Sequence, residues 1–310
     1  MDESENSYED EEEDASDLGT DKKGMSLDMY FKVHGISLDD EENEEDEEDE
    51  KDERAKDNWI MLSNCKKLHN SEFKDRQEVE FYQGQPIGPT RKVISDLRNF
   101  LGTVVRNPTF VTLLYTSRHG VSDKSKEDMW EYINEKFILP IESMQWVMQA
   151  LCRAWKKYKG QIKLLHFMKY KTKEQMMRNR PLHIPEVQFR KLIRYWRLPE
   201  IKALSEKNIE NRSKQTCPHR MGSTGFAFVR KQLRDSKENN EEPSRAEIFT
   251  VTRSSKKGKE IDPKSQSTID ELKRRIEAGE DHEDAFVQVL EKDPPGRLRS
   301  YGASITKKLS

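Results

Sequence analysis

The chain contains 310 residues, of which 36% are charged and 33% are hydrophobic. Average domains are about 45 to 50% apolar and about 25% charged, so one compact core of this length is not expected. No apolar run approaches the roughly 18 residues that a membrane span requires, and the N-terminus lacks the basic and apolar regions of a signal peptide. We therefore expect a soluble protein that is neither secreted nor bound to a membrane.

The three cysteines, Cys65, Cys152 and Cys217, are far apart and form no C-x-x-C motif. Neither Cys65 with His69 nor Cys217 with His219 has zinc-finger spacing, so we expect ordinary packing and turn roles for them. Isolated cysteines in odd number are typical of a reducing compartment, the cytosol or the nucleus. We predict no metal site and no cofactor.

The formal net charge of -3 hides an uneven distribution along the chain. Residues 1–54 carry 25 acidic and 5 basic side chains, or -20, so the remaining 33 acidic and 50 basic side chains give residues 55–310 a charge of +17. The run 41–57 has no apolar residue except Ala55 and cannot offset the entropy of ordering. We predict a disordered acidic head over 1–57, interrupted by a short apolar island at 25–38.

Two interpretations of the acidic head remain open. It is either a solubilising tail or an acidic segment that folds back on the basic body and competes with a polyanion. The opposite charges of the two parts motivate the second interpretation. Deleting the head and measuring affinity for nucleic acid distinguishes them.

After a linker over 58–84, apolar residues recur at the spacing of helix faces. The residues 110–115 are rich in strand formers but stand nearly alone, so they are a strand or an extended connector. The helices predicted in a basic unit over 85–200 begin at Arg91, at an N-cap Asp123 and at Ile141, continue beyond Gly160, and resume from Phe189 to Trp196. The helix that follows Asp123 is expected to carry Trp130, Ile133 and Phe137 on one face and to end at Pro140.

An exposed helix is predicted over 201–216, because its apolar stripe of Ile201, Leu204 and Ile209 is thin. A smaller C-terminal helical unit over 217–303 and a tail over 304–310 follow. Ser244 and Glu247 have the spacing of a capping box at one of its helices. The predicted fold class is mainly α: a helical body with at most one or two short strands, plus a disordered acidic N-terminal region. The further helices of this unit are expected around Phe226 to Leu233, Ile269 to Ile276 and Phe286 to Leu290.

The most informative stretch is Arg153–Arg180, which has ten basic residues, one acidic residue and several interleaved aromatic residues. Lysine and arginine neutralise phosphates, and aromatic faces can stack on bases, so the pattern favours nucleic-acid binding. A solvated basic face above buried aromatic residues is the alternative. The candidate nucleic-acid-binding residues are Arg153, Lys156, Lys157, Lys159, Lys163, Lys169, Lys171, Lys173, Arg178 and Arg180, with Arg297 and Arg299 as a second patch or a helix-terminating motif.

Catalytic motifs are missing from the sequence. It has no phosphate-binding G-x-x-x-x-G-K-[ST] loop and no G-x-S-x-G nucleophile motif. Two-metal strand transfer requires carboxylates held by the strands of a sheet, whereas the acidic residues here lie on predicted helices or in the head. We assign no catalytic residue and expect a protein without enzymatic activity, an expectation that strand cleavage with magnesium or manganese would overturn.

Ordered sequence blocks across 83–303 resemble the plant Ptta/En/Spm-type transposase family. The blocks are 84–89, 100–108, 130–137, 153–159, 179–181, 195–196, 205–212 and 218–223, followed by the most specific ones at 243–249, 284–290 and 295–302. The resemblance implies a nuclear protein of a plant transposable element, with DNA as partner and the catalytic transposase subunit or a second copy as further candidates. It also implies the accessory, non-catalytic type of the family.

Two functions from different classes follow. The first is a transposase-derived DNA-binding protein that contacts DNA through a basic helical segment, without strand-transfer chemistry of its own. The alternative is a domesticated helical protein-interaction scaffold in the nucleus, with the helix at 200–216 as its contact surface.

Overall fold

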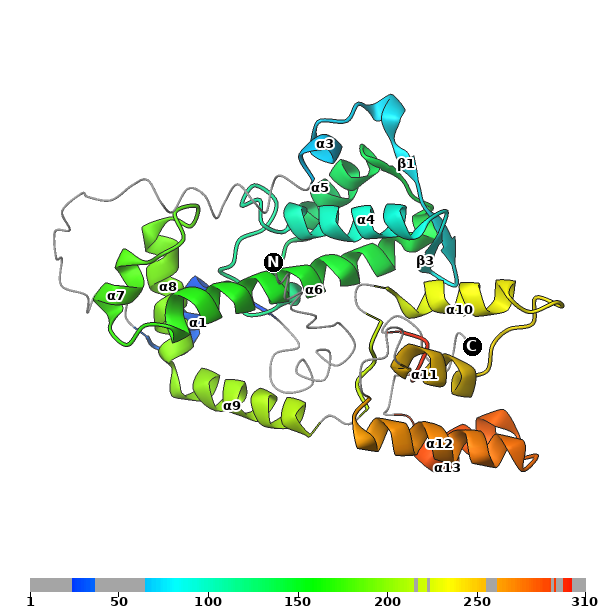
Figure 1. Cartoon of the computed structure of the whole chain (residues 1–310). Coiled ribbons are helices and arrows are strands. Elements are labelled where there is room, and N and C mark those ends of the chain that lie inside the picture. Colours follow the sequence, from blue (N-terminus) through cyan, green and yellow to red (C-terminus); the bar gives the residue numbers. More distant parts are fainter. Residues whose placement is uncertain are drawn as a thin grey trace, which may run out of the picture.

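The structure is a computed structural model that describes residues 24–36, 65–214, 217–221, 224–254, 261–290, 293 and 298–302. These residues are mainly helical, which confirms the predicted fold class, and they include four short strands where the sequence predicts one or two. The helices form a larger unit up to residue 198 and a smaller unit from residue 217, with α9 (Pro199–Ser213) between them (Figure 1). In the described part of the chain, no helix combines the length and apolar character needed to cross a membrane.

The core of the larger unit forms where α4 packs against α6 (Figure 1). Apolar residues at helical spacing bury one face of each helix, as Leu97 and Leu101 of α4 and Phe189 of α8 show with 0% exposure. Burying such a side chain contributes roughly 1.5 to 3 kcal/mol. The main helices of this unit are α4 (Arg91–Val104), α5 (Asp123–Asn134), α6 (Met144–Ile162), α7 (Lys173–Arg178) and α8 (Glu186–Arg197).

Three local predictions around α5 and α6 are wrong. The N-cap of α5 is Ser122 instead of Asp123, because the Ser122 Oγ accepts the Ser125 N–H at 3.1 Å. Phe137 lies in strand β4 (Phe137–Ile138), since α5 ends three residues earlier. Ile141 is 70% exposed in a 3₁₀ turn before α6. The buried residues of α6 are Trp146, Val147, Leu151, Cys152, Trp155, Tyr158 and Ile162.

The predicted linker at 58–84 contains secondary structure from α3 (Lys66–His69) onward. Strand β1 (Gln77–Glu78) pairs in parallel with β4, and β2 (Glu80–Tyr82) pairs antiparallel with β3 (Gln85–Gly88). The two-residue turn between β2 and β3 has positive φ at both positions, the conformation that favours tight hairpins. Strands of two to four residues are too short to show a periodic signal, and the β1–β4 pair joins segments that are far apart in the sequence.

Residues 24–36 differ from the disorder predicted for 1–57. They contain α1 (Leu27–Val33), whose Leu27 and Phe31 are 0% and 1% exposed in the core of the larger unit. The Leu27 N–H donates to the Leu114 carbonyl at 2.7 Å. The segment 110–115 is therefore an extended connector, and the first residue of α1 is hydrogen-bonded to it. The rest of the predicted head and the tail at 304–310 lie outside the described residues.

The smaller unit has its own buried residues, among them Phe249, Leu272 and Phe286. The predicted capping box is confirmed, because the Ser244 Oγ accepts the Glu247 N–H and the Glu247 carboxylate accepts the Ser244 N–H. By contrast, α9 buries none of its residues, as its thin apolar stripe predicts. The helices of the smaller unit are α10 (Phe226–Asp235), α11 (Arg245–Arg253), α12 (Pro263–Glu277) and α13 (His282–Leu290).

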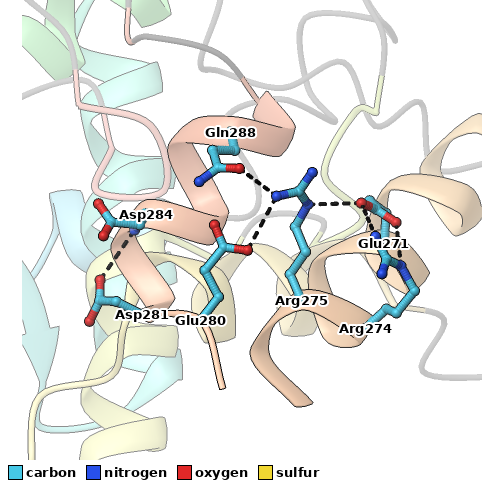
Figure 2. Close-up of polar contacts among 7 residues, drawn as sticks. All are labelled: Glu271, Arg274, Arg275, Glu280, Asp281, Asp284 and Gln288. Atoms are coloured by element: carbon cyan, nitrogen blue, oxygen red, sulfur yellow. Dashed lines mark hydrogen bonds and ion pairs between the residues drawn. The ribbon is translucent and has the colours of Figure 1, made fainter. Parts of the chain in front are cut away.

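Figure 2 shows a polar network that joins α12 to α13. Glu271 accepts hydrogen bonds from Arg274 and Arg275, which lower the pKa of the Glu271 carboxyl to about 2. Arg275 also donates to Glu280 at 3.2 Å and to Gln288 of α13 (Figure 2). The arginines of this surface are therefore neutralised by neighbouring carboxylates.

The two units touch where β2 and β3 meet α10 (Figure 1). The Tyr82 hydroxyl donates to Glu242 at 3.2 Å, and the Arg234 guanidinium lies 5.0 Å from the Tyr82 ring. Arg230 is 2% exposed and lies 4.8 Å from the ring of Tyr301. Two sequence blocks that are more than 200 residues apart, 84–89 and 295–302, thus converge on α10 through β3 and Tyr301.

Candidate nucleic-acid interface

The predicted basic segment runs from the second half of α6 through η5 (Lys163–Met168) and α7 to residue 180. It lies on the side of the molecule opposite α10 to α13 (Figure 1). Among its ten basic residues, four side chains are exposed: Lys157, Lys169, Lys171 and Arg178. The six that are partly buried are Arg153, Lys156, Lys159, Lys163, Lys173 and Arg180.

Lys159 is part of the fold and points into it. Its Nζ donates to the Tyr115 carbonyl at 2.5 Å and lies 5.1 Å and 5.2 Å from the rings of Trp155 and Tyr195. Burial of the amine, together with the nearby charge of Lys163, lowers the pKa of Lys159 to about 7. This side chain therefore ties α6 to the 110–115 connector and does not belong to an exposed basic surface.

Lys163 also has a partner within the fold. Its Nζ donates to the Ser205 Oγ of α9 at 3.1 Å, and burial lowers the pKa of its amine. The contact links η5 to the middle of α9. η5 is π-helical, a conformation that is often found at functional sites.

The aromatic residues of the basic segment pack mostly inside the protein. Trp155 is 4% exposed and donates its Nε1–H to the Thr112 carbonyl at 3.1 Å. Tyr158 is 5% exposed, its hydroxyl contacts His183 Nε2 at 2.5 Å, and burial raises the pKa of Tyr158 to about 12. Phe167 packs on Trp196 with ring centroids 5.4 Å apart. For these aromatic residues the geometry agrees with core packing and provides no stacking platform for bases.

The second predicted patch has a structural explanation in the residues that are described. The Arg299 guanidinium donates to the Leu290 carbonyl, and its backbone N–H donates to Asp293 at 3.1 Å. Arg299 therefore binds the end of α13, as the alternative of a helix-terminating motif predicts. Arg297 lies outside the described residues.

Sequence reasoning missed two features beside the basic segment. Leu164, Leu165 and Met168 of η5 are 54 to 59% exposed, although helical spacing suggested a buried face there. Arg194 and Arg197 of α8 line a cavity together with Lys173 of α7. Arg194 and Arg197 lie on the polar face of a helix that the sequence does predict, but no local pattern indicates that Lys173 faces them.

The histidine and cysteine pairs have packing contacts. His69 contacts the Tyr132 hydroxyl and the Thr103 Oγ1, both at 2.8 Å, and the Cys217 Sγ lies 3.5 Å from the Thr268 Oγ1. Within the residues that the structure describes, no group of three or more histidine, cysteine, aspartate or glutamate side chains is placed to hold a metal ion.

The fold and its charges define a helical protein with a basic segment in the larger unit and a densely ion-paired smaller unit. Residues 185–308 match the family model of the plant transposases, Ptta/En/Spm family. The match confirms the resemblance from α8 through the smaller unit, whereas the blocks before residue 185 lie outside it. No curated protein and no solved structure matches the chain. The chain is thus transposon-related over its C-terminal part, and the basic segment 153–180 precedes the matched region.

Proposed function

We propose that this protein binds duplex DNA as a transposase-derived protein of a plant mobile element, through the exposed cations of its basic segment. The observation that carries the proposal is the absence of ion pairs for Lys157, Lys169, Lys171 and Arg178 among the described residues. Unpaired exposed cations are free to displace the counterions of a phosphate backbone. We call these four residues the exposed cations.

The proposal includes binding without strand-transfer chemistry. Glu271 and Glu280 in Figure 2 are paired with arginines, and among the described residues no three histidine, cysteine, aspartate or glutamate side chains are placed to hold a metal ion. The same proposal includes the nucleus as the location of the protein. It also includes, as additional partners, the catalytic transposase subunit or a second copy of this chain, and both parts rest on the family resemblance.

A salt titration of binding to duplex DNA tests the proposal. Each neutralised phosphate contributes about -0.9 to the slope of log affinity against log salt, so four contacts give a slope of about -3.6. Steep binding of this kind supports the proposal. Absence of binding at low salt, or a flat salt dependence, overturns it.

A protein-interaction scaffold is the second candidate, and α9 favours it. This helix has no buried residue, and its Leu204 and Ile209 are 37% and 61% exposed. The double variant Leu204→Glu, Ile209→Glu should abolish capture of a protein partner from nuclease-treated nuclear extract while leaving DNA binding unchanged. Capture that is equal for the variant and the unmodified chain contradicts this use of α9.

A further inference from the structure

A cavity of about 250 Å³ opens where α7, α8 and the start of α9 come together. Its polar lining consists of three cations from two helices, Lys173, Arg194 and Arg197, and its apolar lining includes Ile36 and Ile193. The volume is below the roughly 300 to 1,000 Å³ of pockets for drug-sized ligands. A small anion fits both the size and the charge of this cavity.

No acidic side chain lines the cavity. Arg194 and Arg197 make no ion pair among the described residues, and the Arg194 guanidinium lies 5.9 Å from the Phe31 ring. Two acids lie close by. The first is Glu174. The pKa of its carboxyl is lowered by a hydrogen bond from its own backbone N–H, by a hydrogen bond with Thr172, and by the charges of Arg197 and Lys173. Glu200 accepts the Tyr30 hydroxyl at 3.1 Å.

The first turn of α9 adds to the positive potential of the cavity. The helix has 15 residues and begins at Pro199, which has no N–H, and the Ile201 N–H donates to the Leu198 carbonyl at 3.1 Å, so the first turn offers an anion the helix dipole more than a set of open N–H groups. Leu198 and Pro199 both line the cavity. The macrodipole of a helix places a partial positive charge at its N-terminal end, and this charge favours anions.

We propose that this cavity binds a phosphate group and that the phosphate belongs to the DNA backbone. The proposal rests on the proposed function, and it adds Arg194 and Arg197 to the binding residues. Guanidinium groups hold phosphate oxygens through paired, charge-assisted hydrogen bonds, which fix position as well as add affinity. Since Lys173 follows Lys171 in the chain, a phosphate held here lies next to the exposed cations and sets the register of the duplex against them.

The test uses the full chain and two readouts. In the first, binding of duplex DNA is measured for Arg197→Gln and for Arg194→Gln, with Lys207→Gln on the exposed face of α9 as the matched control. We expect a loss of about tenfold in affinity for each arginine variant and a salt slope that is less steep by about 0.9. The control should lose much less, because Lys207 lies outside the cavity.

In the second readout, inorganic phosphate is titrated while the melting temperature is followed. The unmodified chain and Lys207→Gln should be stabilised by phosphate in a saturable manner, and the arginine variants should not. Arg197 is exposed, so its variant is expected to fold; for the half-buried Arg194, the variant Arg194→Lys keeps the charge and should retain part of the response.

The outcomes separate the two proposals. If the unmodified chain binds DNA and both arginine variants bind like the control, the cavity proposal is overturned and the proposed function stands. If phosphate stabilises the chain through the arginines but duplex DNA does not bind, the proposed function and the DNA source of the phosphate are overturned. Loss of both responses in the arginine variants alone supports the cavity as a contact for backbone phosphate.

Discussion

The arginine pairs of the smaller unit and the basic segment of the larger unit use their cations in opposite ways. In the smaller unit, Arg245 is 5% exposed and binds Asp293 at 2.6 Å, and Arg275 binds Glu271 at 2.8 Å. In the larger unit, Lys157, Lys171 and Arg178 are exposed and have no ion pair among the described residues. A count of charges does not reveal this difference, because both units are rich in lysine and arginine.

This difference indicates which cations should be tested for binding to a polyanion. A buried, paired guanidinium is committed to the fold, because separating it from its carboxylate leaves an uncompensated charge. An exposed, unpaired cation contributes little to stability and can neutralise a phosphate instead. The basic segment of the larger unit is therefore where the proposed polyanion contacts should be tested, while the family match covers the smaller unit.

The largest effect is expected from Arg245→Ala. The variant removes the guanidinium that pairs with the Asp293 carboxylate, which is 3% exposed, and that lies 4.3 Å from the Phe286 ring. Breaking a buried pair costs about 3 to 5 kcal/mol, so urea unfolding should show that loss in the smaller unit. Arg274→Ala, at an exposed pair, is the control with an expected change of at most about 1 kcal/mol. Equal, small losses for both variants would contradict the paired role of Arg245.

The next effect concerns the larger unit. Replacing all four exposed cations by glutamine should remove about 3.6 from the magnitude of the salt slope and leave the melting temperature almost unchanged. A fourfold glutamine variant at Lys202, Lys207, Lys264 and Lys273 serves as a control of equal charge, since these lysines are also exposed. Similar losses in the two variants would show that only net charge matters.

A smaller effect is expected from the acidic head. Deleting residues 1–54 would also remove α1, whose Leu27 and Phe31 lie in the core, so deletion confuses charge with folding. Replacing the nine acidic residues of 41–50 by asparagine and glutamine keeps α1. If the head competes with DNA, the affinity of this variant rises, most of all at low salt. Unchanged affinity favours the solubilising tail.

A separate effect on stability is a pH dependence that comes from Lys159. Its pKa is about 7 in the folded protein, below the ordinary value of 10.5, so the unfolded chain binds more protons between these pH values. Stability conferred by this group therefore rises with pH from about 7 upward, by no more than about 1.4 kcal/mol per pH unit. The difference in unfolding free energy between the unmodified chain and Lys159→Met, measured from pH 6 to 9, should follow this trend. A constant difference contradicts it.

Local patterns predicted the helices with the clearest periodicity. Phe189, Leu192, Ile193 and Trp196 recur at helical spacing and are all buried on α8. The capping box at Ser244 is likewise a contact between residues three apart, and such contacts depend on the backbone of a single turn. The exposed character of α9 followed from its thin apolar stripe.

Long-range contacts escaped the same reasoning. α1 is too short to be stable alone, and its place in the core depends on the connector at 110–115. The strands β1 and β4 are two residues each and form only because distant segments meet. Lys159 faces the Tyr115 carbonyl and not solvent because the connector at 110–115 packs against α6. The spacing of residues along α6 does not predict this contact.

The sequence by itself determined the mainly helical class, the separation of acidic and basic parts, and the resemblance that the family match confirms over residues 185–308. Only the tertiary structure decided which cations are exposed, which are paired, and which converge on a cavity, as Lys173, Arg194 and Arg197 do. The physical reason is the distance along the chain over which each kind of interaction acts. Helical periodicity and capping act within a few residues, whereas pairing, burial and convergence of charge depend on where distant segments meet in the folded chain.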